Sequence, residues 1–317
     1  MEKSCHGKQA GGFVDRPVKL SDSLMRLRSL LKHILILAVI VWCGSVRLSA
    51  QCSDAGVCSL SKHPAQSRAS GFQSSISVGY TFGRSSSADD ITYHAARLEG
   101  SFQLLEASRV SFLLPFNSQS GPLGSTSGLG DAIVIWRQTV LQREGATLHL
   151  ELGGRFATGD ANRNASLPQP YQSGLGTNDV LLGASADLGA FDVALAGQIP
   201  FGRSSNAISR LKRGSDVLVR CGYTPVAGTL TVHPSLLLIK RLGESSIADP
   251  TPLMSPSFID VPGSEQTQIN ILIDASFRIS EMYFFDAGIA VPLLKREINP
   301  DGLTRAITLS TGFSIRF

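Results

Sequence analysis

The sequence predicts an all-β protein, a transmembrane antiparallel β-barrel of about twelve strands. Three observations support this fold class: apolar residues recur at every second position through nearly all of the chain after residue 70, the gaps between these segments alternate between long and very short, and Arg greatly outnumbers Lys on the polar faces. The last segment shows the alternation clearly, because Ile307, Leu309 and Phe313 share one strand face while Ser310 and Gly312 share the other.

The alternating segments follow one another from residue 71 to the C-terminus. None of them has the 3.6-residue period of an amphipathic helix of useful length, because Gly and small polar residues are frequent on the polar face. We therefore expect strands near residues 71–83, 91–104, 107–117, 130–142, 145–158, 177–188, 190–201, 214–224, 227–242, 266–279, 281–295 and 304–317.

The connections between these segments differ in length by a regular rule. Every second gap is long, at residues 84–90, 118–129, 159–176, 202–213, 243–265 and 296–303, and the gaps between them have one or two residues. Outer-membrane barrels have this asymmetry, because their strands run up and down through the bilayer. The pattern thus predicts long extracellular loops and short periplasmic turns.

The charged positions on the polar face of the predicted strands are mostly Arg, Asp and Glu. After residue 50 the chain has 17 arginines but only 4 lysines. Arg makes two parallel hydrogen bonds to a carboxylate, which suits a confined polar lumen, and barrel closure leaves no unpaired strand edge in lipid. The residues expected to line the lumen are Arg97, Glu99, Arg137, Glu151, Arg155, Asp187, Asp216, Arg220, Asp274 and Arg278.

The N-terminal region reads as a signal peptide within residues 1–50. Basic residues precede an apolar run from Ile34 to Cys43, and Leu48-Ser49-Ala50 forms a small-residue junction. The run is too short to span a membrane. Residues 1–24 have no place in such a signal, so an alternative start at Met25 would make them an upstream extension of the reading frame.

Two regions follow the predicted cleavage site. Residues 51–70 would form a periplasmic segment or a plug, and residues 71–317 the barrel. In an oxidising compartment there are two alternatives for Cys52 and Cys58: they form a disulfide across a short loop, or both remain unpaired thiols.

Composition and motifs exclude several function classes. Residues 1–50 hold 8 of the 29 basic and 3 of the 25 acidic residues, which leaves 21 basic and 22 acidic residues in the rest of the chain. The basic excess therefore lies in the leader, and no nucleic-acid partner is expected. The chain has no phosphate loop, no dinucleotide fingerprint and no Gly-x-Ser-x-Gly motif, so we expect neither a cofactor nor an enzymatic activity. His94, His149 and His233 are scattered, which argues against a metal site.

Several short motifs carry a family resemblance. Gly128-Leu129-Gly130-Asp131 and Ala157-Thr158-Gly159-Asp160 flank the fourth and fifth predicted strands, and Gly174-Leu175-Gly176-Thr177-Asn178-Asp179 opens the sixth. This series, within residues 125–202, resembles the outer-membrane barrels named for the meta-pathway of phenol degradation, related to the long-chain fatty acid transporter. Ala157 departs from the family, which usually has proline there. The terminal Ile315-Arg316-Phe317 resembles the recognition signal of bacterial outer-membrane barrels.

The motif residues also have a purely physical interpretation. Glycine at strand ends permits tight turns and close backbone approach, and Asp131 and Asp179 are placed to bond neighbouring backbone amides. A ligand-contacting role is the open alternative. Pro115, Pro200 and Pro292 each remove a ladder hydrogen bond, so bulges or interruptions are expected there. The residues of this loop-base motif are Gly128, Gly130, Asp131, Gly159, Gly174, Gly176 and Asp179.

The resemblance and the barrel pattern imply an outer-membrane protein of a Gram-negative bacterium. Its expected partners are membrane lipid, the outer-membrane barrel assembly machinery and a small molecule of unknown identity. We expect passive transport of small hydrophobic or amphipathic compounds; the alternative is a non-transporting structural or surface-interaction barrel. The long loops 159–176 and 243–265 carry apolar residues that either contact a solute or form a self-packed lid: Leu167, Pro168, Pro170, Tyr171, Pro250, Pro252, Leu253, Met254, Pro256 and Phe258.

Overall fold

The computed structural model describes residues 74–85, 90–225, 228–251, 257–300 and 305–317. The chain divides into two units, residues 1–47 and 48–317, and every described residue belongs to the second. The predicted signal peptide, its upstream extension and residues 51–70 lie outside the described residues. No described helix has the length and apolar character needed to span a membrane.

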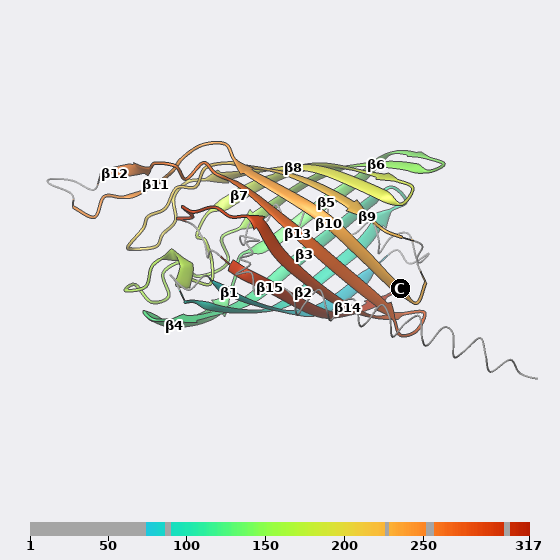
Figure 1. The fold of residues 1–317 in the computed structure, drawn as a ribbon, viewed down its shortest axis with the longest axis horizontal. Helices are drawn as coiled ribbons and strands as arrows, with labels where there is room; N and C mark the ends of the chain where they lie inside the picture. The colour runs from blue at the N-terminus through green and yellow to red at the C-terminus, as the bar shows by residue number, and fades with distance from the viewer. Residues whose placement is uncertain (1–73, 86–89, 226–227, 252–256, 301–304) are drawn as a thin grey trace, which may run out of the picture. The chain divides into compact units, whose positions relative to one another are not determined.

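The described part of the chain folds as a closed antiparallel barrel, which confirms the predicted fold class. One sheet contains 13 strands; β4 pairs only with β3, and the other twelve form the ring (Figure 1). The ring strands, in their order around the barrel, are β1 (Ser75–Ser85), β2 (Thr92–Leu105), β3 (Ser108–Gly121), β5 (Ala132–Arg143), β6 (Ala146–Phe156), β7 (Asn178–Leu188), β8 (Phe191–Phe201), β9 (Asp216–Tyr223), β10 (Leu230–Arg241), β13 (Thr267–Arg278), β14 (Tyr283–Leu294) and β15 (Arg305–Arg316).

The first and last strands close the ring. β1 and β15 pair from Ser75 opposite Arg316 to Gly83 opposite Thr308 without a break in register. Backbone bonds between Ser74 and Phe317, 2.9 and 3.0 Å long, extend the seam by one further pair. The ring therefore has no open edge, and each strand finds its backbone partners on both sides.

The connections alternate in length as predicted. Two of the short ones turn at Gly145 (φ 74°) and Gly189 (φ 59°), where a left-handed backbone conformation favours glycine. Two short connections are longer than expected: residues 224–229 between β9 and β10, as long as the β1–β2 loop, where two were expected, and residues 279–282 between β13 and β14, where one was expected. The ring thus has a long-loop end and a short-turn end.

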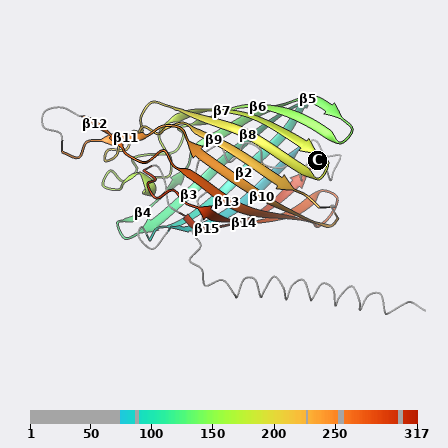
Figure 2. The same cartoon turned by 45° about the horizontal axis from the view of Figure 1, so that its top comes forward.

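Three short strands lie where only loops were expected. β4 (Gly124–Leu129) folds back on β3, and β11 (Ser245–Ala248) pairs with β12 (Phe258–Val261) in a separate hairpin. All three lie at the same end of the ring in both views (Figure 2). The expectation of an unstructured connection over residues 118–129 was therefore wrong. β4 has the sequence Gly-Ser-Thr-Ser-Gly-Leu, which has no large apolar residue at alternate positions, so the search for a two-residue apolar period did not detect it.

Two of the three noted prolines mark irregularities in the strands. Pro115 lies where the partner of β3 changes from β5 to β4, and its carbonyl oxygen accepts a bond from Gly130. Pro292 lies at a register shift between β13 and β14. Pro200 stays in unbroken register with Asp179 on β7.

The two faces of each strand differ in polarity. Positions that face outward are apolar and exposed, while the alternate positions are buried or half-buried and largely polar. The outward set includes Val78, Tyr80, Leu98, Phe116, Trp136, Leu152, Leu195, Ile199, Leu236, Ile273, Phe285 and Phe313. An apolar outer surface around a ring of paired strands is the surface that a membrane-spanning barrel presents to lipid.

A closed ring of this kind predicts heat-modifiable electrophoresis. The unheated protein in dodecyl sulfate should keep its barrel and migrate faster than the boiled protein, because opening the ring exposes backbone groups along two strand edges at once. Circular dichroism of the unheated sample should show β-structure. A helix-rich spectrum would contradict the fold.

Candidate functional site

The charged residues predicted to line the lumen lie on the inward-facing side of their strands. Their positions alternate with the exposed apolar residues along each strand. Arg278 keeps this alternation but is exposed at the short-turn end. The inward face is therefore a mixed-sign surface, and its ion pairs fall into groups at different depths.

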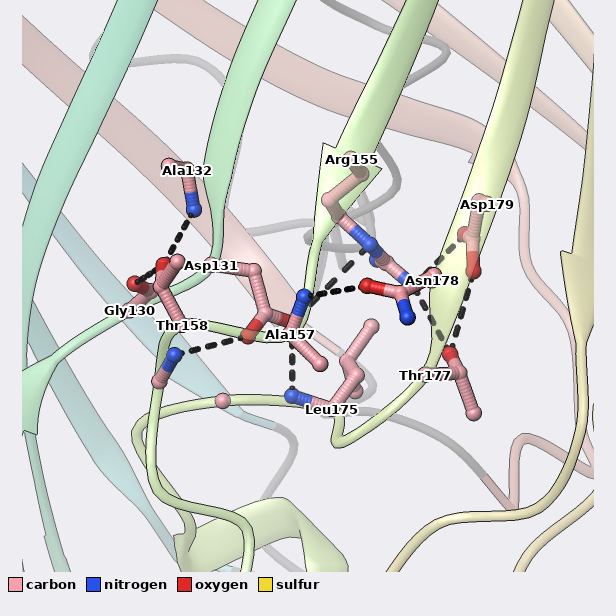
Figure 3. Close-up of polar contacts among 12 residues, drawn as sticks. Gly130, Asp131, Ala132, Arg155, Ala157, Thr158, Leu175, Thr177, Asn178 and Asp179 are labelled. Atoms are coloured by element: carbon pink, nitrogen blue, oxygen red, sulfur yellow. Dashed lines mark hydrogen bonds and ion pairs between the residues drawn. The ribbon is translucent and has the colours of Figure 1, made fainter.

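One buried ion cluster lies under the long loops. The Asp179 carboxylate at the start of β7 accepts a bond from the Arg155 guanidinium of β6 at 2.6 Å (Figure 3). It accepts another from Arg213 of the β8–β9 loop. Gln198 of β8 and Thr177 also donate to Asp179. Asp179 was expected to bond backbone amides; it bonds side chains instead, because its strand brings it beside Arg155.

Asp131 does bind backbone amides, from a loop distant in sequence. Its two carboxylate oxygens accept the N–H of Gly159 at 3.1 Å and the N–H of Leu175 at 2.8 Å (Figure 3). Thr158 adds a third tie, donating its hydroxyl to the carbonyl of Gly130 at 3.0 Å. Asp131 thereby holds both ends of the β6–β7 loop against the start of β5.

Burial raises the pKa of the Asp131 carboxyl above its usual value. The Arg155 guanidinium and the N–H groups of Leu175 and Gly159 oppose this shift only in part. The ionised form is thus less favoured here than on an exposed carboxyl, although the N–H groups of the loop and the Arg155 guanidinium partly favour it.

Three of the motif glycines pack backbone against backbone. A Cβ atom on Gly159 would lie 2.7 Å from the Cα of Gly174 and 2.8 Å from the carbonyl carbon of Gly130. Gly176 has a φ of 67°, and Gly128 leaves room for the Arg163 guanidinium. The motif therefore holds three segments of the mouth in direct backbone contact, around Gly130, Gly159 and Gly174.

A second buried cluster has the same composition on the neighbouring wall. Asp216 of β9 binds two guanidinium groups at 3.0 Å, from Arg241 of β10 and from Arg296 of the β14–β15 loop. All three side chains are at most 1% exposed. In each cluster, a carboxylate on a strand holds an arginine from a long loop.

Further ion pairs lie toward the short-turn end. Their members belong to strands on all sides of the ring, and two of them contain histidine. The pairs are Arg97–Glu99, Arg137–Glu151, His149–Asp187, His233–Asp192, Arg220–Asp274 and Arg316–Asp286. His149 also contacts Thr139 at 3.0 Å, and His94 on the outer face contacts the Tyr80 hydroxyl.

An aliphatic cluster separates the two charged zones on one wall. Its members face inward from β5, β7, β8, β9 and β10 and are buried: Ile133, Ile135, Leu181, Ala196, Leu218, Leu237 and Ile239. Sequence analysis missed this cluster because it followed the charges on the polar face. The signal was present, since Leu218 and Leu237 alternate with the outward apolar positions of their own strands.

The β6–β7 loop folds inward over the mouth. Leu167 and Tyr171 pack against Ile91, Tyr93 and Ala95 of β2 and the residue preceding it. Asn117 and Gln119 of β3 donate side-chain bonds to the carbonyls of Ser173 and Gln172. The apolar residues of this loop are thus used in packing, as expected of a self-packed lid.

The β8–β9 loop binds the β6–β7 loop on one side and the β10–β13 connection on the other. Ser204 donates to Gln169 at 2.7 Å, and the Asn206 amide donates to the carbonyl of Ala161 at 3.0 Å. Lys212 pairs through the backbone with Ser246 of β11, within the β11–β12 hairpin.

Only two of the apolar residues noted in the second long loop, Pro250 and Phe258, are among the described residues. The described Phe258 is 43% exposed and lies under the Arg203 guanidinium at 3.7 Å, while Pro250 lies just before the gap in the described residues. Pro252, Leu253, Met254 and Pro256 lie outside the described residues, as do Cys52 and Cys58. Within the described ranges, no three His, Cys, Asp or Glu side chains are grouped so as to hold a metal ion.

Comparisons with known proteins support the fold. No protein-family model matches the chain, and no curated protein matches it either. An outer membrane channel from Pseudomonas putida F1 has a similar structure, with a TM-score of 0.62 at 19% identity over 81% of this chain and 100% of that one. Two porins resemble this chain more weakly. NanC has a TM-score of 0.48 at 10% identity over 77% of this chain and 100% of its own, and KdgM has a TM-score of 0.43 at 11% identity over 77% of this chain and 99% of its own. The meta-pathway family itself stays a hypothesis.

Asp131 should control the stability of the β6–β7 loop. Asp131→Ala leaves two backbone N–H groups without their acceptor, a loss of about 2 kcal/mol that raises the open population of the loop about 30-fold. Limited trypsin digestion should then cleave faster after Arg163. Asp260→Ala, in the exposed β12 strand, is the matched control and should leave cleavage unchanged. Equal rates in both variants would show that the carboxylate does not anchor the loop.

Gly174 should tolerate no side chain. The Cβ of Gly174→Ala would lie 2.6 Å from the carbonyl carbon of Gly159 and 2.7 Å from Asp131. We expect a cost of about 1–3 kcal/mol, read as a lower temperature for loss of the fast-migrating band. Gly243→Ala is the control, because nothing lies within 4 Å of its Cβ. Similar temperatures for the two variants would refute the close packing.

Proposed function

We propose that this protein is a passive channel in the outer membrane of a Gram-negative bacterium. The observation that carries the proposal is the closed ring with an apolar outer face and a charged, partly exposed inner face. A barrel that served only as a membrane anchor would gain nothing from half-exposed charges in its interior, whereas a water-filled path needs them.

The orientation follows from the loop lengths. Outer-membrane barrels have short turns in the periplasm and long loops outside. The interlocked loops of residues 157–177, 202–215 and 242–266 then form the extracellular mouth, and Phe317 lies at the periplasmic end beside Ser74. Assembly machinery acting on the C-terminal strand from the periplasm would find that strand accessible.

The solutes we infer are small and amphipathic. Leu113 of β3 and Leu272 of β13 are only partly buried and lie beside the aliphatic cluster. The nearby charges include Glu99 and Asp274, both partly exposed. A compound with an apolar body and a polar end would meet suitable groups in this interior, and the loop cap favours small compounds over large ones.

A non-transporting barrel is the second candidate. The buried clusters around Asp179 and Asp216 hold the loops firmly over the mouth, which would also suit a structural or surface-interaction protein. A buried pair that loses one partner costs about 3–5 kcal/mol, so these clusters resist opening.

We assign no catalytic step to the barrel. His149 and His233 each contact a carboxylate, and His94 contacts a phenol on the outer face. Acyl transfer needs a hydroxyl or thiol nucleophile beside a histidine; His149 does contact the Thr139 hydroxyl at 3.0 Å, and the absence of enzymatic activity stays a prediction.

Conductance of the purified protein tests the proposal. Reconstituted in planar bilayers in KCl, the heat-modifiable protein should give discrete current steps, and liposomes that contain it should swell in small amphipathic solutes without an energy source. The boiled protein is the control. A folded barrel that gives neither current nor swelling would overturn the channel and leave the structural candidate.

A further inference from the structure

The inner wall of the ring is unequally exposed. On β8 to β10 and their loops, the paired charges are almost completely buried, with Asp216 at 1% and Asp192 at 4%. On the opposite side, Glu99 of β2 is 29% exposed, Asp286 of β14 is 26% and Asp274 of β13 is 37%. Solvent therefore reaches the charges of β2, β13 and β14 more than those of β8 to β10. Arg316 of β15, at 5%, is an exception on the first side, and the charges on β5 to β7 are intermediate, with Arg137 at 21% and Asp187 at 16%.

Some inward-facing glycines show the same contrast. On the buried wall, neighbours fill the space above them: a Cβ on Gly222 would lie 2.3 Å from the His233 imidazole, and one on Gly153 would lie 2.6 Å from a backbone oxygen. On the exposed wall, a Cβ on Gly312 would meet nothing closer than 3.4 Å. Gly79 has its nearest neighbours at 3.2 Å, a backbone oxygen and the end of the Arg97 side chain.

Two inward-facing glycines do not show this contrast. A Cβ on Gly288 of β14 would lie 2.6 Å from the Ser310 hydroxyl, and one on Gly183 of β7 would lie no closer than 3.3 Å to any neighbour.

Gly79 and Gly312 are direct partners across the β1–β15 seam. In the strand register, Asp286 of β14 lies opposite Gly312 on one side of this pair, and Arg97 of β2 lies opposite Gly79 on the other side. Two adjacent strands thus contribute no side chain to this row, and a charge of opposite sign stands at each end. We call this row of four residues the glycine trough.

Strand spacing sets the scale of the trough. Adjacent strands lie about 4.8 Å apart, so the Cα atoms of Asp286 and Arg97 are separated by about 14 Å along the wall. The Arg97 guanidinium covers the Gly79 end of this stretch, within 3.2 Å of the Cβ position of Gly79, and the uncovered part lies over Gly312. Any side chain larger than hydrogen at Gly79 or Gly312 would project into it.

We propose that solutes pass along the glycine trough, off the centre of the barrel, and that Gly79 and Gly312 set the size limit while Arg97 and Asp286 set the charge preference. This inference rests on the proposed channel function and gives it a location. A solute with separated positive and negative groups fits this row best, because its anionic group can face Arg97 while its cationic group faces Asp286.

Side-chain size in the trough provides the first test. Gly312→Leu should reduce single-channel conductance in KCl severalfold. Thr311→Leu changes the next residue, which faces outward, and should conduct like the parent. Both variants must first show heat-modifiable migration. If a folded Gly312→Leu variant conducts like the parent, the path runs elsewhere and the inference fails while the channel stands.

Charge provides the second test. In a KCl gradient, Arg97→Gln should shift the reversal potential toward cation preference and Asp286→Asn toward anion preference, because each removes one charge from the border of the path. Arg84→Gln, in an exposed pair with Asp90, is the control. Reversal potentials that do not move in opposite directions would contradict the placement of the path.

Chemical labelling separates this inference from the channel proposal. In a background with serine in place of the native cysteines, Gly312→Cys in the folded barrel should react with a charged, water-soluble methanethiosulfonate, and Ala196→Cys on the buried wall should not. Labelling of Gly312→Cys without any parent conductance would refute the channel but support a hydrated trough. An unlabelled Gly312→Cys together with a conducting parent would refute the trough alone.

Discussion

Closure of the ring by the hydrogen bonds between β1 and β15 is the constraint on which the rest of the structure depends. In lipid an unpaired backbone group costs several kcal/mol, so an open sheet of this length would not persist in a bilayer. Once the seam from Ser74 to Ser85 is paired, every strand has a fixed inner and outer face. The apolar outer residues, the charged interior and the positions of the loops then follow from one register.

Closure also forces charged side chains into a confined interior. The protein stabilises them by letting one carboxylate bind two guanidinium groups. Asp179 and Asp216 each bind one arginine from a neighbouring strand and one from a loop. An arginine left alone at such depth would be strongly unfavourable, so each loop must stay down to keep its arginine paired. The ion clusters therefore stabilise the mouth as well as the barrel.

Alternation in the sequence was sufficient to predict the ring strands, their number and the long-loop end, because a half-buried strand must repeat every two residues. It was not sufficient for β4, whose Ser125, Thr126 and Ser127 carry no apolar face. The role of Asp131 was accessible because a glycine-rich strand end needs an acceptor for its amides. The partners of Asp179 were not, since Arg213 comes from a loop whose path no local pattern specifies.

The inner wall cannot be divided into its two halves from alternation alone, because Leu218 and Gly312 occupy equivalent inward positions in their strands. The difference arises only when the ring closes and the long loops bring Arg213 and Arg296 onto the β7 to β10 side. Packing concentrated on that side leaves the opposite wall, with its paired glycines, half-exposed. The same loops that cap the mouth thus determine on which side of the barrel the proposed passage lies.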